Sequence, residues 1–177
     1  MTLDSVIDDI LRREGWPKVT ARPSDLGGLT KGGITQTTAN QYFGRRLTTK
    51  EFVELVDETV ARAIYRKMYG ERYEFIPSER IRALLVDYAV TSWHDDAVRA
   101  LQRGLGVPED GIIGERTRRA VNSMDADKVY RAIWLHRYEK FFKEAYDRAT
   151  MQFLADNHST QLHNLKGWLN RLTEFLP

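Results

Sequence analysis

The segment between residues 3 and 35 constrains the fold most, because an amphipathic helix meets a glycine-rich loop there at a single glutamate, Glu14. Apolar residues at three- and four-residue spacing form one buried stripe on this helix: Val6, Ile7, Ile10 and Leu11. Glu14 continues the same stripe. Gly15 and Pro17 both terminate helices, so the helix is expected to end at the glutamate.

Glu14 is therefore predicted to be half buried at a helix end. Desolvation against the apolar stripe raises the pKa of a carboxyl group, and the negative end of the helix dipole raises it further. A carboxyl group of this kind stays protonated near neutral pH and can act as a general acid. The alternative interpretation is a glutamate at a frayed helix end that reaches water or pairs with Arg12 or Arg13.

The loop that follows is unusually rich in glycine, with four glycines between residues 27 and 33. Glycine is used where the backbone turns with positive φ or approaches another group closely. Directly after a helix that carries a carboxylate, such a loop is typical of the wall of a polar cleft. We expect at most a small β-hairpin, between Val19 and Ile34.

Composition limits the class of protein. With 177 residues, of which 42% are apolar, the chain is long enough for a well-filled core. A net charge of +2 is compatible with an anionic polymer such as cell wall or nucleic acid and requires neither. Without cysteine, neither a disulfide framework nor a thiolate metal site is possible. The four histidines show no zinc-ligand spacing, so we expect neither a metal nor another cofactor.

The apolar runs are too short to span a bilayer, and the first twenty residues contain no signal-peptide core. We therefore expect synthesis in the cytoplasm and no stable membrane insertion. A substrate in the periplasm or cell wall would be reached only after release by a separate route.

The next part of the chain is predicted to be helical. Residues 35–43 are predicted to form a short helix ended by Gly44. Thr48 and Glu51 form a capping box for a long helix that fades near residues 68–70. Four aromatic residues follow its core-facing stripe: Tyr65, Tyr69, Tyr73 and Phe75. They are interpreted either as core packing or as contacts to sugar rings.

Further helices are expected in the second half of the chain. Their predicted N-terminal signals are Ser78, Asp95, Gly114 and Asp125, and a final helix carries an apolar stripe that includes Leu162 and Trp168. The fold class is mainly α, a lysozyme-like α+β protein with a single compact helical unit. We expect a monomer, with a dimer as the alternative.

Other chemistry is less well supported. The glycines lack the spacing of a nucleotide-binding loop, and no nucleophile elbow is present. The basic segment 115–119 could indicate a DNA-reading helix. Acidic residues surround it, so a solvated helix face is favoured and no nucleic acid partner is expected.

Several motifs together resemble glycosyl hydrolase family 108, the N-acetylmuramidases of phage endolysins and secretion loci. The matching blocks are Glu14-Gly15, Gly27-Gly28-Leu29-Thr30-Lys31, Gly33-Ile34-Thr35, residues 64–69, 85–90, 101–107 and 110–117, and residues 167–171. The similarity covers nearly the whole chain. It implies a hydrolase segment, residues 1–76, with a helical peptidoglycan-binding-like segment, residues 77–177, packed on it.

The chain also departs from the family pattern. Gly15-Trp16-Pro17 stands where the family has two glycines and an aromatic residue, which reshapes the start of the loop. Arg22 stands where the family often carries an aspartate, leaving Asp25 as the only carboxylate close behind Glu14. Thr91 replaces an expected asparagine, which weakens any binding role at that position.

The resemblance implies cleavage of the β-1,4 bond between N-acetylmuramic acid and N-acetylglucosamine in peptidoglycan glycan strands, with Glu14 as general acid. Asp25 is the candidate for the second carboxylate, with Thr30 or Thr35 positioning water. A helix cap or turn is the alternative role of Asp25.

Substrate contacts are expected from Trp16, Gly28, Lys31, Tyr42 and Asp87. Asp87 could instead be a structural carboxylate paired with Arg82 or with a loop amide. A lytic transglycosylase and a non-catalytic wall-binding or secretion-accessory protein remain as alternatives.

Overall fold

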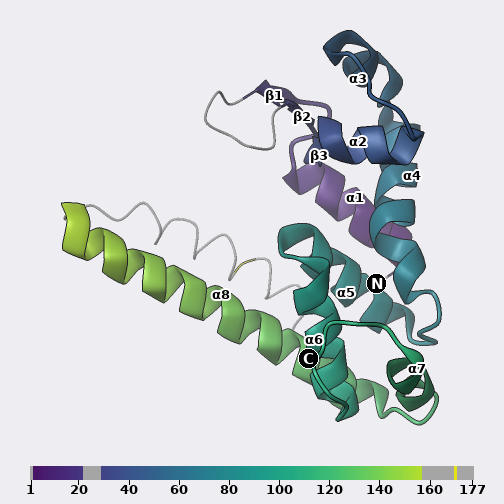
Figure 1. Cartoon of the computed structure of the whole chain (residues 1–177), viewed down its shortest axis with the longest axis vertical. Helices are drawn as coiled ribbons and strands as arrows, with labels where there is room; N and C mark the ends of the chain where they lie inside the picture. Colours follow the sequence, from purple (N-terminus) through teal and green to yellow (C-terminus); the bar gives the residue numbers. More distant parts are fainter. Residues whose placement is uncertain (1, 22–28, 157–169, 171–177) are drawn as a thin grey trace. The chain divides into compact units, whose positions relative to one another are not determined.

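The computed structural model describes residues 2–21, 29–156 and 170 (Figure 1). The chain forms two compact units, Met1–Asp87 and Tyr88–Pro177. The division between these units lies inside helix α5, and the boundary expected between residues 76 and 77 for the two functional segments stays a prediction. Asp25, Gly28 and the expected final helix with Trp168 lie outside the described residues.

The first unit combines helices with a small sheet. Its elements are α1 (Leu3–Arg13), β1 (Val19–Ala21), β2 (Leu29–Lys31), β3 (Ile34–Thr35), α2 (Gln36–Phe43), α3 (Thr49–Leu55), α4 (Glu58–Tyr65), the π-helical turn η1 (Arg66–Gly70), the 3-10 turn η2 (Glu71–Tyr73) and most of α5 (Glu79–Thr91). The core contains Ile7, Ile10, Phe52, Ile64, Tyr65 and Leu84. The mainly α class with a small sheet is confirmed.

Helix α1 ends where the sequence predicted. Its four stripe residues are buried. Gly15 follows the helix with φ 72°, donates its N–H to the Arg12 carbonyl at 3.2 Å, and is followed by Trp16, which donates to the Leu11 carbonyl at 2.9 Å. These two bonds form a Schellman motif, in which a left-handed glycine closes the last helical turn. The backbone direction after Glu14 is therefore fixed.

The predicted hairpin is part of a three-stranded antiparallel sheet of order β1-β2-β3. Strands β2 and β3 are joined by Gly32 and Gly33, whose φ angles of 52° and 79° fit a type I′ turn. Only residues that tolerate positive φ suit both central positions, which explains two glycines there. The turn places the end of the glycine loop next to the end of α1.

The long helix expected from Thr48 is interrupted, which corrects the prediction. The capping box of Thr48 and Glu51 is present, but α3 ends at Leu55. Asp57 then accepts a hydrogen bond from the Val60 N–H at 2.8 Å and begins α4 as a new N-cap. Because the apolar spacing continues across this break, periodicity alone did not reveal it.

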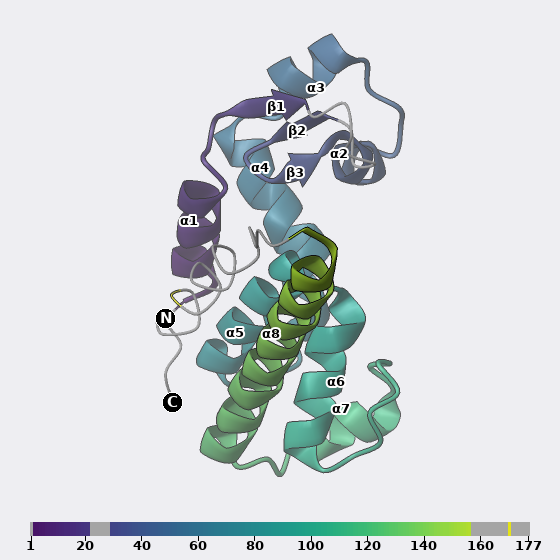
Figure 2. The ribbon, with the colours of Figure 1, turned by 90° about the vertical axis from the view of Figure 1, so that its left-hand side faces the viewer.

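The second unit consists of the end of α5 with α6 (His94–Leu105), α7 (Glu115–Val121) and α8 (Ala126–Asp156). Helices α6 and α8 pack side by side (Figure 2). Asp125 caps α8, as predicted, by accepting the Lys128 N–H at 3.1 Å. Trp93, rather than Asp95, occupies the N-cap position of α6.

Gln102 of α6 is buried and forms hydrogen bonds to the loop between α6 and α7. The Gln102 amide nitrogen donates to the Asp110 carboxylate at 2.6 Å and to the Ile112 carbonyl at 3.0 Å. Its oxygen accepts the Gly111 N–H at 2.9 Å. The Thr117 hydroxyl lies 3.2 Å from the same amide nitrogen. Two of the sequence blocks, 101–107 and 110–117, therefore meet at this side chain.

Candidate active site around Glu14

Glu14 is the C-cap residue of α1, and its side chain is exposed. The expectation of a half-buried carboxylate is wrong, because Glu14 is the C-cap and lies at the solvent-exposed end of the stripe, although its N–H still donates to the Ile10 carbonyl at 2.9 Å. Its aliphatic stem nevertheless has a fixed neighbour. A Cβ atom placed on Gly33 would lie only 2.7 Å from the Glu14 Cγ, so the stem rests directly on the glycine backbone.

Tyr65 also contacts the Gly32-Gly33 turn, from the core of the unit. Its buried hydroxyl donates to the Gly32 carbonyl at 2.9 Å and lies 2.8 Å from where a Gly33 Cβ would be. The contact joins residues 33 positions apart in the sequence. Glu14, Gly33 and Tyr65 thus form one packed group, which sequence reasoning missed because it treated Tyr65 only as part of an aromatic cluster.

Tyr69 completes this group. Its ring packs against that of Tyr65 with centroids 5.8 Å apart, and its backbone belongs to the π-helical turn η1. Burial raises the pKa of the Tyr69 phenol, and the negative charge of Glu14 raises it further. The phenol is therefore neutral at physiological pH.

Trp16 and Lys31 lie on the other side of the turn. The Trp16 ring covers Gly32 so closely that a side chain at that position would collide with it. The Lys31 ammonium group lies 5.3 Å from the Trp16 ring centroid, a cation–π distance, and donates to the Val53 carbonyl at 2.7 Å. Both residues brace the loop, and their predicted contact with substrate stays a prediction.

The two threonines expected to position water lie in one row across the sheet. Thr20, Thr30 and Thr35 are register partners on the three strands, so their side chains share one face. The Thr30 hydroxyl lies 2.6 Å from that of Thr20. Thr35 caps α2 by accepting the Thr38 N–H at 3.0 Å. Both hydroxyls therefore have structural hydrogen bonds, and their catalytic role stays a prediction.

The remaining described candidates differ in exposure. Tyr42 is half buried, and the Lys67 ammonium group lies 5.2 Å from its ring centroid. Asp87 is only 1% exposed and forms an ion pair with Arg13 at 3.5 Å. Its partner is therefore not Arg82, which donates to the Ile76 carbonyl. This burial argues against the prediction that Asp87 contacts substrate and favours the structural alternative.

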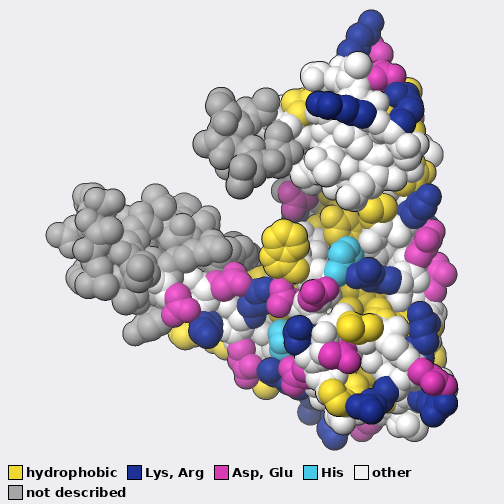
Figure 3. All heavy atoms as spheres, in the orientation of Figure 1, with side chains coloured by type: hydrophobic (Ala, Val, Ile, Leu, Met, Phe, Trp, Pro, Cys, Tyr) yellow, Lys and Arg dark blue, Asp and Glu magenta, His cyan; other side chains and the backbone are white. Residues whose placement is uncertain are grey.

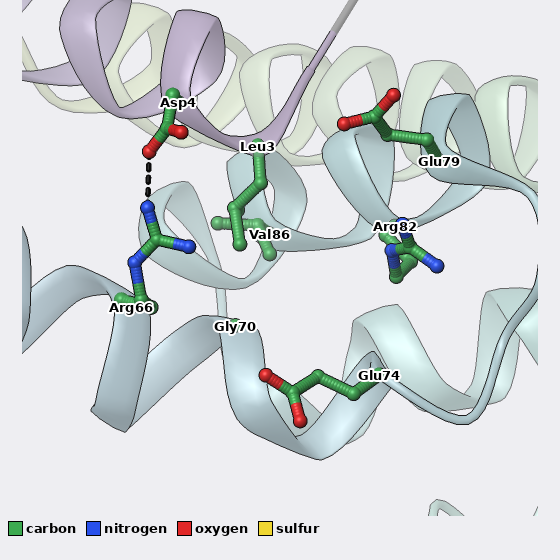
Figure 4. Close-up of a pocket in the computed structure, with 8 residues that line it drawn as sticks. All are labelled: Leu3, Asp4, Arg66, Gly70, Glu74, Glu79, Arg82 and Val86. Carbon is green, nitrogen blue, oxygen red and sulfur yellow. Dashed lines mark hydrogen bonds and ion pairs between the residues drawn. The ribbon is translucent and has the colours of Figure 1, made fainter.

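A pocket of about 310 Å³ lies in the same unit, but Glu14 does not line it (Figure 4). Its walls come from α1, η1 and α5, with Leu3 and Val86 between charged side chains. Asp4 and Arg66 form an ion pair across one side. The pocket is therefore separate from the group around Glu14.

A second hollow, of about 440 Å³, lies between α6 and α8 in the other unit. Charged residues of both signs line it, and several are paired, including Lys140 with Asp96 and Arg103 with Glu139. Positive and negative side chains are also intermingled on the described surface in Figure 3. In α7, Arg119 pairs with Glu115, which favours a solvated helix over a DNA-reading one.

Within the described ranges, no group of three or more histidine, aspartate or glutamate side chains is arranged to hold a metal ion. None of the helices in these ranges is both long and apolar enough to cross a membrane.

Two segments of the chain match known protein families. Residues 7–92, which include α1, the sheet and the group around Glu14, match the family model described as glycosyl hydrolase 108. These residues belong to glycosyl hydrolase family 108. Residues 96–173 match a second model, described as "Predicted Peptidoglycan domain". The family 108 segment followed by this domain supports a peptidoglycan hydrolase.

A solved structure supports the same assignment. The chain is similar to "Structure of Brucella abortus SagA", with 27% sequence identity and a TM-score of 0.68. The match covers 98% of this chain and 90% of the other. No curated protein matches the sequence.

Proposed function

We propose that the protein is an N-acetylmuramidase that cleaves the β-1,4 bond between N-acetylmuramic acid and N-acetylglucosamine in peptidoglycan, with Glu14 as general acid. The observation that supports this most is the position of Glu14. Its side chain is exposed to solvent, while its stem is fixed between the closed end of α1 and the Gly33 backbone. Because the stem is fixed, the carboxyl group can be held in one orientation relative to the glycosidic bond of a bound glycan.

The chemistry requires a proton donor and a second group. Glu14 would donate its proton to the glycosidic oxygen as the bond to the anomeric carbon breaks. A water molecule then adds its oxygen to the anomeric carbon and gives up a proton to a base. Asp25, only a few residues before β2, is our candidate for that base, and Thr30 and Thr35 are candidates for orienting the water.

The peptidoglycan domain would keep the enzyme on its polymer. Residues 96–173 provide the domain match, and residues 7–92 provide the hydrolase segment. We propose that the protein acts as a monomer on the cell wall after release from the cytoplasm, and that Trp16, Lys31 and Tyr42 contact the glycan.

A turbidity assay on outer-membrane-permeabilised bacteria tests this function. Falling turbidity with purified protein is the expected result. Binding to cell walls without a fall would favour a wall-binding or secretion-accessory protein. DNA retention that weakens with salt, again without lysis, would favour the DNA-binding alternative.

A further inference from the structure

We propose that Tyr65 is a positioning residue for Glu14, acting through the Gly32-Gly33 turn. The proposal rests on the proposed function, in which Glu14 is the general acid. Tyr65 does not need to touch substrate for this role, because it fixes the surface against which the Glu14 side chain lies.

The hydroxyl of Tyr65 is anchored in the core. The residue is 2% exposed, and its O–H donates to the Gly32 carbonyl at 2.9 Å. Gly32 is also held by its own N–H, which donates to the Lys18 carbonyl at 3.1 Å. The turn therefore has fixed hydrogen bonds on both sides, to the core and to the segment that follows Glu14.

The Gly32-Gly33 turn also limits the conformations of the Glu14 side chain. A Cβ atom on Gly33 would lie 2.7 Å from the Glu14 Cγ and 3.0 Å from its Cβ. Such distances are shorter than van der Waals contact, so only glycine allows the glutamate stem to lie there. Movement of the turn toward α1 would therefore displace the Glu14 side chain.

Tyr69 restrains the Tyr65 ring. The two rings pack at 5.8 Å with an interplanar angle of 39°, and Tyr69 belongs to a π-helical turn. Such turns occur often at functional sites, because they redirect side chains within a helix. The tyrosine pair therefore forms a rigid support between α4 and the Gly32-Gly33 turn.

Removal of the Tyr65 hydroxyl should impair the chemical step more than substrate binding. Displacing a catalytic group by about 1 Å can cost about 100-fold in rate. For Tyr65→Phe, which keeps the ring, we expect kcat to fall about tenfold on a soluble glycan oligosaccharide of defined length, with KM changed less than about twofold. The matched control is Tyr88→Phe, which removes another buried hydroxyl that hydrogen-bonds His136 at 2.9 Å.

A double-mutant test separates positioning from general stability. In the Glu14→Gln background the acid is absent, so Tyr65→Phe should lower the residual rate less than about twofold. An equal fall in both backgrounds would contradict action through Glu14. A wild-type kcat for Tyr65→Phe, or a change confined to KM, would also overturn the proposal.

A glycine pair gives an independent measurement if Tyr65→Phe does not fold. Gly33 and Gly44 both have positive φ, 79° and 66°, but a Cβ on Gly44 would have nothing within 4 Å. Gly33→Ala should lose about 100-fold in activity per folded molecule, while Gly44→Ala keeps it. Equal activities would contradict the proposal. Full activity of Glu14→Gln alone would instead overturn the proposed function, and the two failures are thereby distinguished.

Discussion

The Asp87 carboxylate of α5 lies 3.5 Å from the guanidinium group of Arg13, the residue that directly precedes Glu14. Asp87 is 1% exposed and Arg13 is 16% exposed, so the pair is shielded from water. It ties the last turn of α1 to α5. The end of α1 that carries Glu14 is therefore held by a buried ion pair.

Asp87→Asn should destabilise the fold without a specific loss of catalysis. Breaking a buried ion pair removes the attraction that offsets the desolvation of its charges, and costs about 3 kcal/mol. The free energy of unfolding from urea denaturation measures this effect. Asp9→Asn is the matched control, because Asp9 pairs with Arg12 at 3.0 Å on the exposed surface and should cost less than about 1 kcal/mol. If Asp87→Asn left the free energy of unfolding unchanged and raised KM, Asp87 would be a substrate-binding residue instead.

Glu14→Gln should abolish lysis while leaving the fold intact. Glutamine has nearly the same volume but no proton to donate, so the rate should fall about 10²- to 10⁴-fold. Because the side chain is exposed, the melting temperature should stay unchanged. Clearing of permeabilised cells by pure protein with matched circular dichroism measures the rate, with exposed Glu54→Gln as control. More than about a tenth of wild-type activity would exclude Glu14 as the acid.

The products of peptidoglycan digestion should carry a hydrated reducing-end N-acetylmuramic acid. This expectation follows from a mechanism in which water completes the cleavage. Mass spectrometry of released muropeptides distinguishes it from internal attack by the sugar hydroxyl. Products one water lighter would identify a lytic transglycosylase and would leave Asp25, Thr30 and Thr35 without the proposed role.

Stability should decrease on acidification because of His136. Burial lowers the pKa of this imidazole below its ordinary value, and the positive charge of Arg103 lowers it further, although Glu109, Asp96 and Glu139 oppose this effect. The unfolded chain therefore binds a proton first as pH falls, so His136 lowers stability below about pH 6.5.

The melting temperature between pH 8 and pH 5 tests this dependence. Its decrease should become smaller in His136→Asn, whose amide can still bond the Tyr88 hydroxyl. Titration of the imidazole by NMR provides the direct check, and a midpoint above the ordinary histidine range would contradict the prediction.

Features set by nearby residues could be predicted from the sequence. The end of α1 at Gly15, the capping box at Thr48 and the cap at Asp125 each depend on residues within a few positions. The position of Glu14 at the end of a helix was likewise predicted, but its exposure was not, because helical periodicity gives the direction of a side chain and not what covers it at a helix end.

Features set by distant residues could not be predicted in the same way. The contact between Tyr65 and Gly32 and the pairing of Asp87 with Arg13 join different elements of the first unit. No local pattern encodes either contact. The break at Asp57 was missed for another reason, since two helices in succession preserved nearly the same apolar spacing.

The glutamine that fastens the loop after α6 leaves much of that loop's surface unconstrained. Gln102 reaches Gly111 and Ile112 through their backbone atoms, and the Ile112 side chain is 67% exposed. Substitution of Ile112 therefore changes the surface of this loop, from apolar to charged, while the backbone hydrogen bonds to Gln102 stay the same.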